Sequence, residues 1–266
     1  MSDDEGNDSG TDDGTTDHTG VGAYTFADVS VVMGTYNERE AIGAVLDDID
    51  RVTGGQAEVV CVDSSSDGTA AVAREHGARV IEQEPQGYGV AVQTAITTPD
   101  RPVIVTTDCD DTYPMERLPK FLTAINDGSD VVSGDRLSKG AQTMPRFNRL
   151  GNHAFAWLAS ALIGERVHDT TTGMRAYRRE VIESIEWTEN TGLSAELLLR
   201  PVVRGYRVTE IPIDYRERVG ETTLSPLAGG AAITKSIGKV ALEERWRALS
   251  GTEPAGLDGT VDGQSR

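Results

Sequence analysis

Short apolar segments alternate with segments of helical periodicity from about residue 28 to residue 125 of this 266-residue chain. The apolar segments are rich in valine and isoleucine, and they have the length of strands that are buried on both faces. Alternation of this kind predicts an α/β domain with a mostly parallel central sheet and helices on both faces. We expect strands at 29–33, 58–62, 78–81 and 102–107, and helices at 38–50, 69–76, 89–96 and 115–125.

The second half of the chain is less regular, but its apolar pattern still predicts helices and strands. No internal repeat and no linker rich in proline or glycine interrupts it, so we expect one domain over residues 23–226. An amphipathic helical segment should follow over residues 227–250. The expected elements are strands at 131–133 and 207–213, and helices at 148–163, 181–185, 194–203 and 228–249.

Acidic residues dominate the charge of the chain. There are 43 acidic and 25 basic residues, which gives a formal net charge of −18 and argues against nucleic acid as a partner. Residues 1–22 contain seven of the acids and no Lys or Arg, and we expect them, like 251–266, to be disordered tails. The remainder is acidic too, which fits an adaptation to high salt, where self-repulsion is screened.

Cysteine content and hydropathy indicate the compartment. Cys61 and Cys109 are the only cysteines, and their spacing matches neither a zinc site nor a disulfide framework. The acidic N-terminus has no signal-peptide pattern, and no apolar run reaches the roughly 18 residues that a membrane span needs. We therefore expect a cytoplasmic chain.

The predicted strand at 102–107 ends in a group of carboxylates. Asp108 and Asp110 are two residues apart, so on extended backbone their side chains point to the same side. Ligands of open α/β sheets bind outside the carboxyl ends of the strands. Because two converging carboxylates repel unless a cation lies between them, the pair predicts a Mg²⁺ or Mn²⁺ ion shared with phosphate oxygens. A solvated acidic turn is the alternative.

Three further turns carry polar or glycine residues. Residues 34–38 close the first strand, residues 63–69 follow the second, and Gly87-Tyr88-Gly89 opens the third helix. Turns at helix N-termini present backbone N–H groups to anions. Alternatively, Asn37 caps the first helix and Asp67 or Thr69 caps the second. The Gly-x-Gly turn lacks the third glycine of a dinucleotide site, so we favour close approach of its backbone to a diphosphate.

In this order and spacing, the turns resemble those of family-2 glycosyltransferases, which have the Rossmann-like GT-A fold. Later motifs resemble the branch that transfers mannose or glucose to polyprenyl (dolichyl) phosphate. The resemblance covers about residues 28–226, which would then form the catalytic domain. The later motifs are Gly134-Asp135-Arg136, Asn148-Arg149-Leu150-Gly151-Asn152, 169–177 (DTTTGMRAY), Glu196, 210–213 (EIPI) and Gly220-Glu221.

The resemblance implies roles for individual residues. Asp108 and Asp110 would hold the metal against the donor diphosphate. Arg136 and Arg149 would meet the acceptor phosphate, and Arg175, with one of Arg216 or Arg218 (we favour Arg218), would lie near the reaction centre. The donor-binding residues would be Thr35, Tyr36, Asn37, Glu38, Asp63, Asp67, Gly87 and Gly89.

The implied reaction is a metal-dependent, inverting transfer of a hexose from a GDP- or UDP-hexose to a polyprenyl phosphate. It would take place at the cytoplasmic face of the membrane, with the enzyme bound peripherally. The 154–163 segment or the 228–249 helix would contact the lipid, although the first also fits a core helix. The alternatives are a hydroxyl acceptor, such as a glycan or small metabolite, and a catalytically silent subunit that binds a nucleotide sugar.

Several positions depart from the pattern of that branch. The loop after Asp63 is one residue shorter than usual, and Asp111-Thr112 replaces an apolar-Gln pair that bears on the third metal ligand. Thr222-Thr223-Leu224 stands where Ser-Lys-Leu is frequent, so one expected positive charge is absent, and the arginine before Gly220 is displaced by one position.

Overall fold

The computed structural model describes residues 22–139, 143–219 and 226–250, with the side chains of 226–228 left aside. Apart from Gly22, the predicted disordered tails lie outside these residues. The motif Gly220-Glu221 and the Thr222-Thr223-Leu224 departure lie outside them as well.

One sheet of seven strands runs through the described residues, in the order β3-β2-β1-β4-β6-β5-β7. β6 pairs antiparallel with β4 and β5, and every other pair is parallel. The predicted α/β class with a mostly parallel sheet is confirmed. The strands are β1 (Val29–Thr35), β2 (Glu58–Asp63), β3 (Arg79–Glu82), β4 (Val103–Thr106), β5 (Val131–Asp135), β6 (Arg175–Arg178) and β7 (Val208–Pro212).

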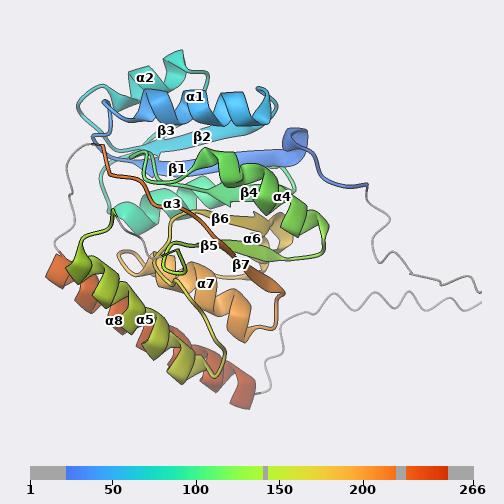
Figure 1. Cartoon of the computed structure of the whole chain (residues 1–266), viewed down its shortest axis with the longest axis vertical. Coiled ribbons are helices and arrows are strands. Elements are labelled where there is room, and N and C mark those ends of the chain that lie inside the picture. Colours follow the sequence, from blue (N-terminus) through green and yellow to red (C-terminus); the bar gives the residue numbers. More distant parts are fainter. Residues whose placement is uncertain (1–21, 140–142, 220–225, 251–266) are drawn as a thin grey trace, which may run out of the picture.

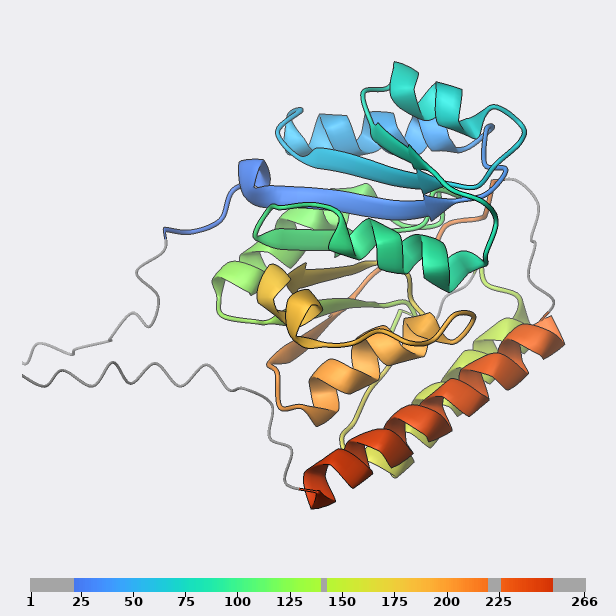
Figure 2. The same cartoon turned by 180° about the vertical axis from the view of Figure 1, so that it is seen from behind.

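Helices cover both faces of the sheet (Figures 1 and 2). Side chains of α1, α2 and α4 form the core of one face, and those of α3, α6 and α7 form the core of the other. α5 and α8 lie side by side outside α7, as both views show. The helices are α1 (Ile42–Thr53), α2 (Thr69–Glu75), α3 (Tyr88–Thr97), α4 (Leu118–Asn126), α5 (Arg146–Ile163), α6 (Arg179–Ser184), α7 (Leu193–Val203) and α8 (Pro226–Leu249), with 3₁₀ turns at Phe26–Asp28 and Met115–Arg117.

Strand β1 shows why the apolar runs are continuous. Val31 and Met33 belong to the core under α1, whereas Val32 belongs to the core over α3. Successive side chains of a strand point to opposite faces, so a strand covered on both faces needs apolar residues at every position.

The first helix begins later than its pattern suggests. α1 starts at Ile42 with Ala41 as its N-cap, so the prediction of a helix from residue 38 capped by Asn37 is wrong. Asn37 has φ 55°, which takes the chain out of helical geometry at this point. Its side-chain oxygen accepts a hydrogen bond from the Ser66 N–H at 3.1 Å instead.

Strand β6 was not expected. Its sequence, Arg-Ala-Tyr-Arg, is short and charged, yet it lies between β4 and β5 in the middle of the sheet. Arg175, its first residue, is fully buried and donates hydrogen bonds to the Ser133 hydroxyl and the Thr170 carbonyl, both at 3.1 Å. Local periodicity cannot reveal a strand whose charges are satisfied by residues distant in the sequence.

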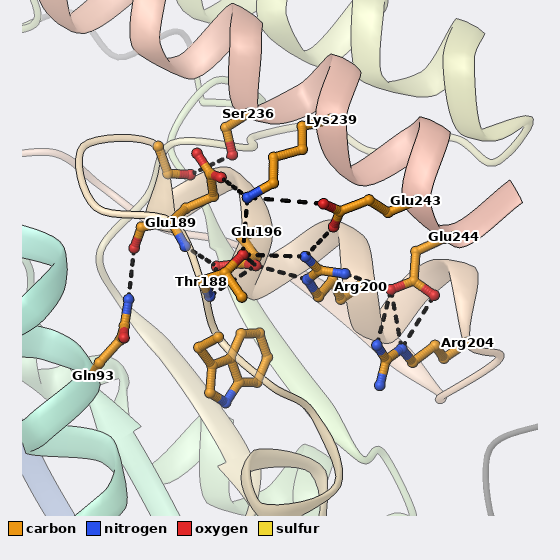
Figure 3. A network of polar contacts seen from close by, with 12 residues as sticks. Gln93, Thr188, Glu189, Glu196, Arg200, Arg204, Ser236, Lys239, Glu243 and Glu244 are labelled. Atoms are coloured by element: carbon orange, nitrogen blue, oxygen red, sulfur yellow. Dashed lines mark hydrogen bonds and ion pairs between the residues drawn. The ribbon is translucent and has the colours of Figure 1, made fainter. Parts of the chain in front are cut away.

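Buried charges fasten α8 to the rest of the domain (Figure 3). Arg200 on α7 is 4% exposed and contacts Glu196, Glu243 and Glu244, each at 2.7 Å. Arg204 contacts Glu244 at 2.9 Å. Both glutamates of α8 therefore point towards α7 rather than away from the molecule.

Replacing Arg200 with alanine should lower the free energy of unfolding by about 3–5 kcal/mol, because it removes the positive charge that pairs with the buried carboxylates of Glu196 and Glu244. The measurement is urea unfolding followed by circular dichroism. Arg51→Ala removes a helix-surface pair with Asp48, in which Arg51 is 63% exposed, and should cost less than about 1 kcal/mol. Equal losses in the two variants would contradict this account of the network.

Candidate active site

The carboxyl ends of β1 and β2 form the first part of the site. Thr35 and Asp63 lie opposite each other in the register, and the Thr35 hydroxyl donates to the Asp63 carboxylate at 2.5 Å. The Ser65 hydroxyl donates to the same carboxylate at 2.6 Å. Asp63 is buried, so in this structure its carboxylate organises the two loops.

The turns after these strands are held together by short polar bonds. The Asn37 N–H donates to the Ser65 hydroxyl at 2.7 Å, and the Glu38 N–H donates to the Thr69 hydroxyl at 3.0 Å. Asp67 accepts from the Thr69 N–H at 3.0 Å, but the N-cap of α2 is Gly68, so the prediction that Asp67 or Thr69 caps this helix is wrong. The two turns thus form one polar surface, on which Tyr36 is exposed.

The predicted acidic pair follows β4 at the same edge of the sheet. Asp110 is buried and accepts from the Thr112 N–H and hydroxyl, at 3.1 and 2.6 Å. Asp108 accepts from the Tyr88 hydroxyl at 3.1 Å. Gly173 packs so closely that a Cβ there would lie 2.6 Å from an Asp108 carboxylate oxygen. Thr112, which departs from the pattern of the branch, therefore holds the Asp110 carboxylate by two hydrogen bonds.

Arg218 lies between two of the acids. Its Nη1 donates to Asp110 at 2.6 Å, and its Nη2 donates to Glu38. Arg216, the other candidate, instead pairs with Asp111 at 3.1 Å and Glu116 at 2.8 Å. The structure therefore brings Arg218, rather than Arg216, to the acidic pair.

Crowding of negative charge shows in the acidities of these groups. Burial, and then the neighbouring Asp110 carboxylate, raise the pKa of Asp108 to about 6. Burial also raises the pKa of Glu38 to about 7 against the opposing effect of Arg218, and Asp110 and Asp108 add to that rise. A cation at this position would relieve the repulsion.

The oxygen ligands fit a magnesium or manganese ion that is shared with a substrate. Within residues 22–139, 143–219 and 226–250, no three acidic, histidine or cysteine side chains converge closely enough to hold a metal alone. Mg²⁺ usually binds one or two carboxylates together with substrate phosphates and water. Asp108 and Asp110 are such a pair, and the unfavourable proximity of their charges is the observation that supports the fit.

Arg136 is buried beside the acidic pair. Its Nε and Nη2 donate to the two Asp169 oxygens at 2.7 and 2.9 Å, and its guanidinium lies 5.3 Å from the centre of the Tyr215 ring. Nη1 makes a longer contact, 3.4 Å, with the Tyr113 hydroxyl. Asp169 thus neutralises the arginine and fixes its plane.

The two other predicted arginines occupy different surroundings. Arg175, the first residue of β6, is buried in the sheet and pairs with Thr106 of β4. Arg149 lies in the first half of α5, a helix that packs against α8 and α7. The structure thus gathers Glu38, Asp108, Asp110, Arg136 and Arg218 around the end of β4, whereas Arg149 lies on a separate helix.

Residues that the sequence did not single out complete the site. Tyr113 accepts from the Gly173 N–H at 2.6 Å, and Tyr88 donates to Asp108. Asn190 occupies the space next to Gly87 and Gly89, so in this structure these glycines accommodate a side chain of the protein. The position of Tyr113 directly after the acidic motif, and of Tyr88 inside the glycine turn, could have indicated that they belong to the site. Nothing in the sequence around Asn190 indicates its role.

Comparison with known proteins agrees with this architecture. The sequence model described as "Glycosyl transferase family 2" matches residues 30–186. The chain belongs to glycosyl transferase family 2. The predicted membership, enzyme class and GT-A fold are confirmed.

Two curated relatives of this family-2 member carry more specific names. It is 74% identical over 224 residues to a dolichyl-phosphate hexose transferase of Haloferax volcanii, covering 84% of this chain and 98% of that protein. It is 30% identical over 241 residues to the polyprenol monophosphomannose synthase of Mycolicibacterium smegmatis, covering 79% of this chain and 84% of that protein.

A solved structure resembles the fold of this glycosyltransferase. Glucosyl-3-phosphoglycerate synthase of Mycobacterium tuberculosis, in complex with Mn²⁺, UDP-glucose and phosphoglyceric acid, superimposes with a TM-score of 0.65. The sequence identity is 22%, over 81% of this chain and 79% of that one. Among the described residues, no helix combines the length and hydropathy that crossing a bilayer requires.

The raised pKa of Asp108 predicts how the stability of the protein depends on pH. The pKa of Asp108 in the folded protein, about 6, lies above its ordinary value of 3.8, so ionised Asp108 opposes folding at pH 8 and the penalty fades towards pH 4. In chelator-treated protein, Asp108→Asn should therefore gain about 1–2 kcal/mol of unfolding free energy at pH 8 and almost nothing at pH 4.

The control is Asp169→Asn, which weakens the buried ion pair with Arg136 and should lose stability at pH 8. Thermal unfolding of the three proteins across this pH range gives the comparison. An Asp108→Asn protein that is no more stable than the wild type at pH 8 would contradict the raised pKa of Asp108.

Proposed function

We propose that this glycosyltransferase is metal-dependent and inverting, and that it moves a hexose from a GDP- or UDP-hexose to a polyprenyl (dolichyl) phosphate. The observation that carries the proposal is the 74% identity to a dolichyl-phosphate hexose transferase over nearly the whole of that protein. The distant neighbour bound to Mn²⁺ and UDP-glucose supports the use of a divalent ion and a nucleotide sugar.

On the donor side, we propose that the polar surface of residues 35–38 and 63–69, together with the Gly87–Gly89 turn, holds the nucleotide sugar. Asp108 and Asp110 would hold Mg²⁺ or Mn²⁺, which supplies electrostatic stabilisation of the leaving diphosphate. Arg218 supports this assignment, because its Nε is buried and has no hydrogen-bond partner among the described residues. An N–H group in that state suits an anionic ligand.

On the acceptor side, we propose that Arg136 and Arg149 receive the phosphate, with Arg175 supporting the floor of the site. The pairing of Arg136 with Asp169 leaves Nη1 as the less committed edge of its guanidinium. A phosphate monoester is already ionised near neutral pH, so its oxygen needs positioning rather than deprotonation before it attacks the sugar. Arginine suits this task because its planar fork donates parallel hydrogen bonds.

Labelled GDP- and UDP-hexoses with Mg²⁺ or Mn²⁺ and a short-chain polyprenyl phosphate should give a labelled lipid with at least one donor. Asp110→Ala should reduce the rate at least about a hundredfold, because the charge of the leaving diphosphate is then left without its metal. Asp47→Ala, which alters a side chain that is 70% exposed on α1, is the matched control and should keep full activity.

Label that reaches only a hydroxyl acceptor would contradict the lipid phosphate and favour the alternative glycosyltransferase. Binding of donor without any transfer would favour a silent subunit. An Asp110→Ala protein as fast as the wild type would contradict the metal assignment.

We also propose that α5 and α8 rest on the cytoplasmic face of the cell membrane. Of the eight large hydrophobic side chains that are exposed in the described residues, six lie on these two helices, with exposures from 66% to 84%. A cluster of this kind on a soluble domain marks an interaction surface. The six residues, which we call the α5/α8 apolar surface, are Phe147, Leu150, Trp157, Leu242, Trp246 and Leu249.

Charge favours an anionic lipid surface as the partner of these helices. α5 contains two arginines and no acidic residue, in a chain that is otherwise strongly acidic. The two glutamates of α8, Glu243 and Glu244, are paired with Arg200 on α7. Lys235 and Arg245 on α8 are exposed. Basic and apolar side chains together are typical of helices that lie in the membrane interface.

Trp157→Glu and Trp246→Glu should each weaken sedimentation with anionic phospholipid vesicles about tenfold or more, because burying one large apolar side chain contributes about 1.5–3 kcal/mol. Lys120→Gln, at an exposed position on α4, changes the net charge by the same amount and should bind as the wild type does. Transfer to a water-soluble short-chain acceptor should be unaffected in all three. Unchanged vesicle binding of both tryptophan variants would contradict this surface.

A further inference from the structure

The segment between α6 and α7 contacts both the glycine turn at the start of α3 and helix α8. This connecting segment, residues 185–192, begins where the family match ends at residue 186. Asn190 lies within it and contacts the glycine turn on both sides of Tyr88. Its Oδ1 accepts from the Gly89 N–H at 2.9 Å, and its Nδ2 donates to the Gln86 carbonyl at 2.9 Å. One side chain thus fixes both ends of the turn.

The two glycines are needed because Asn190 is so close. A Cβ on Gly87 would lie 2.6 Å from Asn190 Nδ2, and a Cβ on Gly89 would lie 2.3 Å from the Asn190 carbonyl oxygen. Gly87 also has φ 104°, a conformation that other residues rarely adopt. The Gly-x-Gly pattern and Asn190 therefore form one packing unit, although about a hundred residues separate them.

The residue held by this unit reaches the acidic pair. Tyr88 lies between the two glycines, and its hydroxyl donates to Asp108 at 3.1 Å. Displacement of the turn would move this hydroxyl away from the carboxylate. Hydrogen bonds from neighbouring groups orient metal ligands, and their loss typically costs about 10–100-fold in metal affinity.

The other side of the connecting segment rests on α7 and α8 (Figure 3). Glu196 on α7 is fully buried and accepts from the Thr188 and Glu189 N–H groups at 3.0 and 2.9 Å. Lys239 on α8 contacts the Glu189 carboxylate at 2.7 Å, and the Glu189 carbonyl accepts from Gln93 of α3 at 2.6 Å. The segment is therefore anchored at Thr188 and Glu189, directly before Asn190, by groups of α3, α7 and α8.

We propose that Asn190 is a positioning residue that holds Tyr88 against Asp108, and that α7 and α8 act as the platform that keeps Asn190 in place. The role rests on the proposed function, since it takes Asp108 as a ligand of the metal that is shared with the donor diphosphate. Asn190 does not touch the reacting atoms in this role. It acts through the turn, and the C-terminal helices then serve the active site as well as the fold.

The test measures binding of Mn²⁺ with UDP and with GDP to the full chain by titration calorimetry. Asn190→Ala and Tyr88→Phe should each weaken this binding about 10–100-fold. Because both changes break one chain of contacts, the double variant should bind about as weakly as the weaker single variant rather than showing the product of both losses.

Asn126→Ala is the matched control. Asn126 also holds backbone groups on both sides of its amide, accepting from the Tyr24 N–H at 2.8 Å and donating to the Tyr24 carbonyl at 3.0 Å. It should lower the melting temperature by an amount comparable to Asn190→Ala and leave nucleotide binding unchanged. Should Asn190→Ala fail to fold, Asn190→Asp keeps the volume and the bond to Gly89. It replaces the donor to Gln86 with a negatively charged acceptor, which opposes the Gln86 carbonyl and should still weaken binding.

Three outcomes would overturn the proposal. If a folded Asn190 variant binds Mn²⁺ and nucleotide as tightly as the wild type does, Asn190 has no positioning role, and the proposed function is unaffected. Full multiplication of the two losses in the double variant excludes action through Tyr88. Absence of Mn²⁺–nucleotide binding in the wild type would overturn the proposed function, and this inference with it.

Discussion

Repulsion between Asp108 and Asp110 is the interaction on which the arrangement of this site depends. Both carboxylates lie just after β4, a strand that is buried on both faces. The surrounding groups limit the cost: Thr112 donates to Asp110, Tyr88 donates to Asp108, and Arg218 brings a positive charge. The pKa of Asp108 is nevertheless raised, first by burial and then by the neighbouring Asp110 carboxylate. A divalent ion with its bound diphosphate is the ligand that this imbalance favours.

Charge pairing also decides what the C-terminal helix exposes. Glu243 and Glu244 would make α8 a poor partner for an anionic surface if they faced outwards. Glu244 is buried between Arg200 and Arg204, and the charge of the more exposed Glu243 is paired with Arg200 and Lys239. Both acidic charges are therefore neutralised, and the basic and apolar residues of α8 dominate its outer side. The same arginines hold Glu196, which supports the segment that contains Asn190. One buried network thus serves the attachment of α8, the surface of α8 and, through the connecting segment, the glycine turn.

Much of the fold could be predicted because it follows from local patterns. Short runs rich in valine marked β1, β2 and β4, and the parallel arrangement followed from the helices between them. Departures arose where distant contacts outweigh local preference. Asn37 adopts φ 55° and delays α1, while Arg175 begins an interior strand because Ser133 and Thr170 satisfy its guanidinium. In the site, the motif order placed Asp108 and Asp110 at the end of β4, and the family resemblance favoured Arg218 over Arg216. The contact of Arg218 with Asp110 came only from the structure.

The sequence alone determined the α/β class, the family and the position of the acidic pair, because each depends on residue types at short spacing along the chain. Only the tertiary structure decided that Arg218 reaches Asp110, that Asp169 neutralises Arg136, and that Asn190 occupies the space beside the two glycines. Each of these contacts joins residues at least 33 positions apart. No local pattern encodes such a contact, since it exists only once the sheet and its covering helices have brought the partners together.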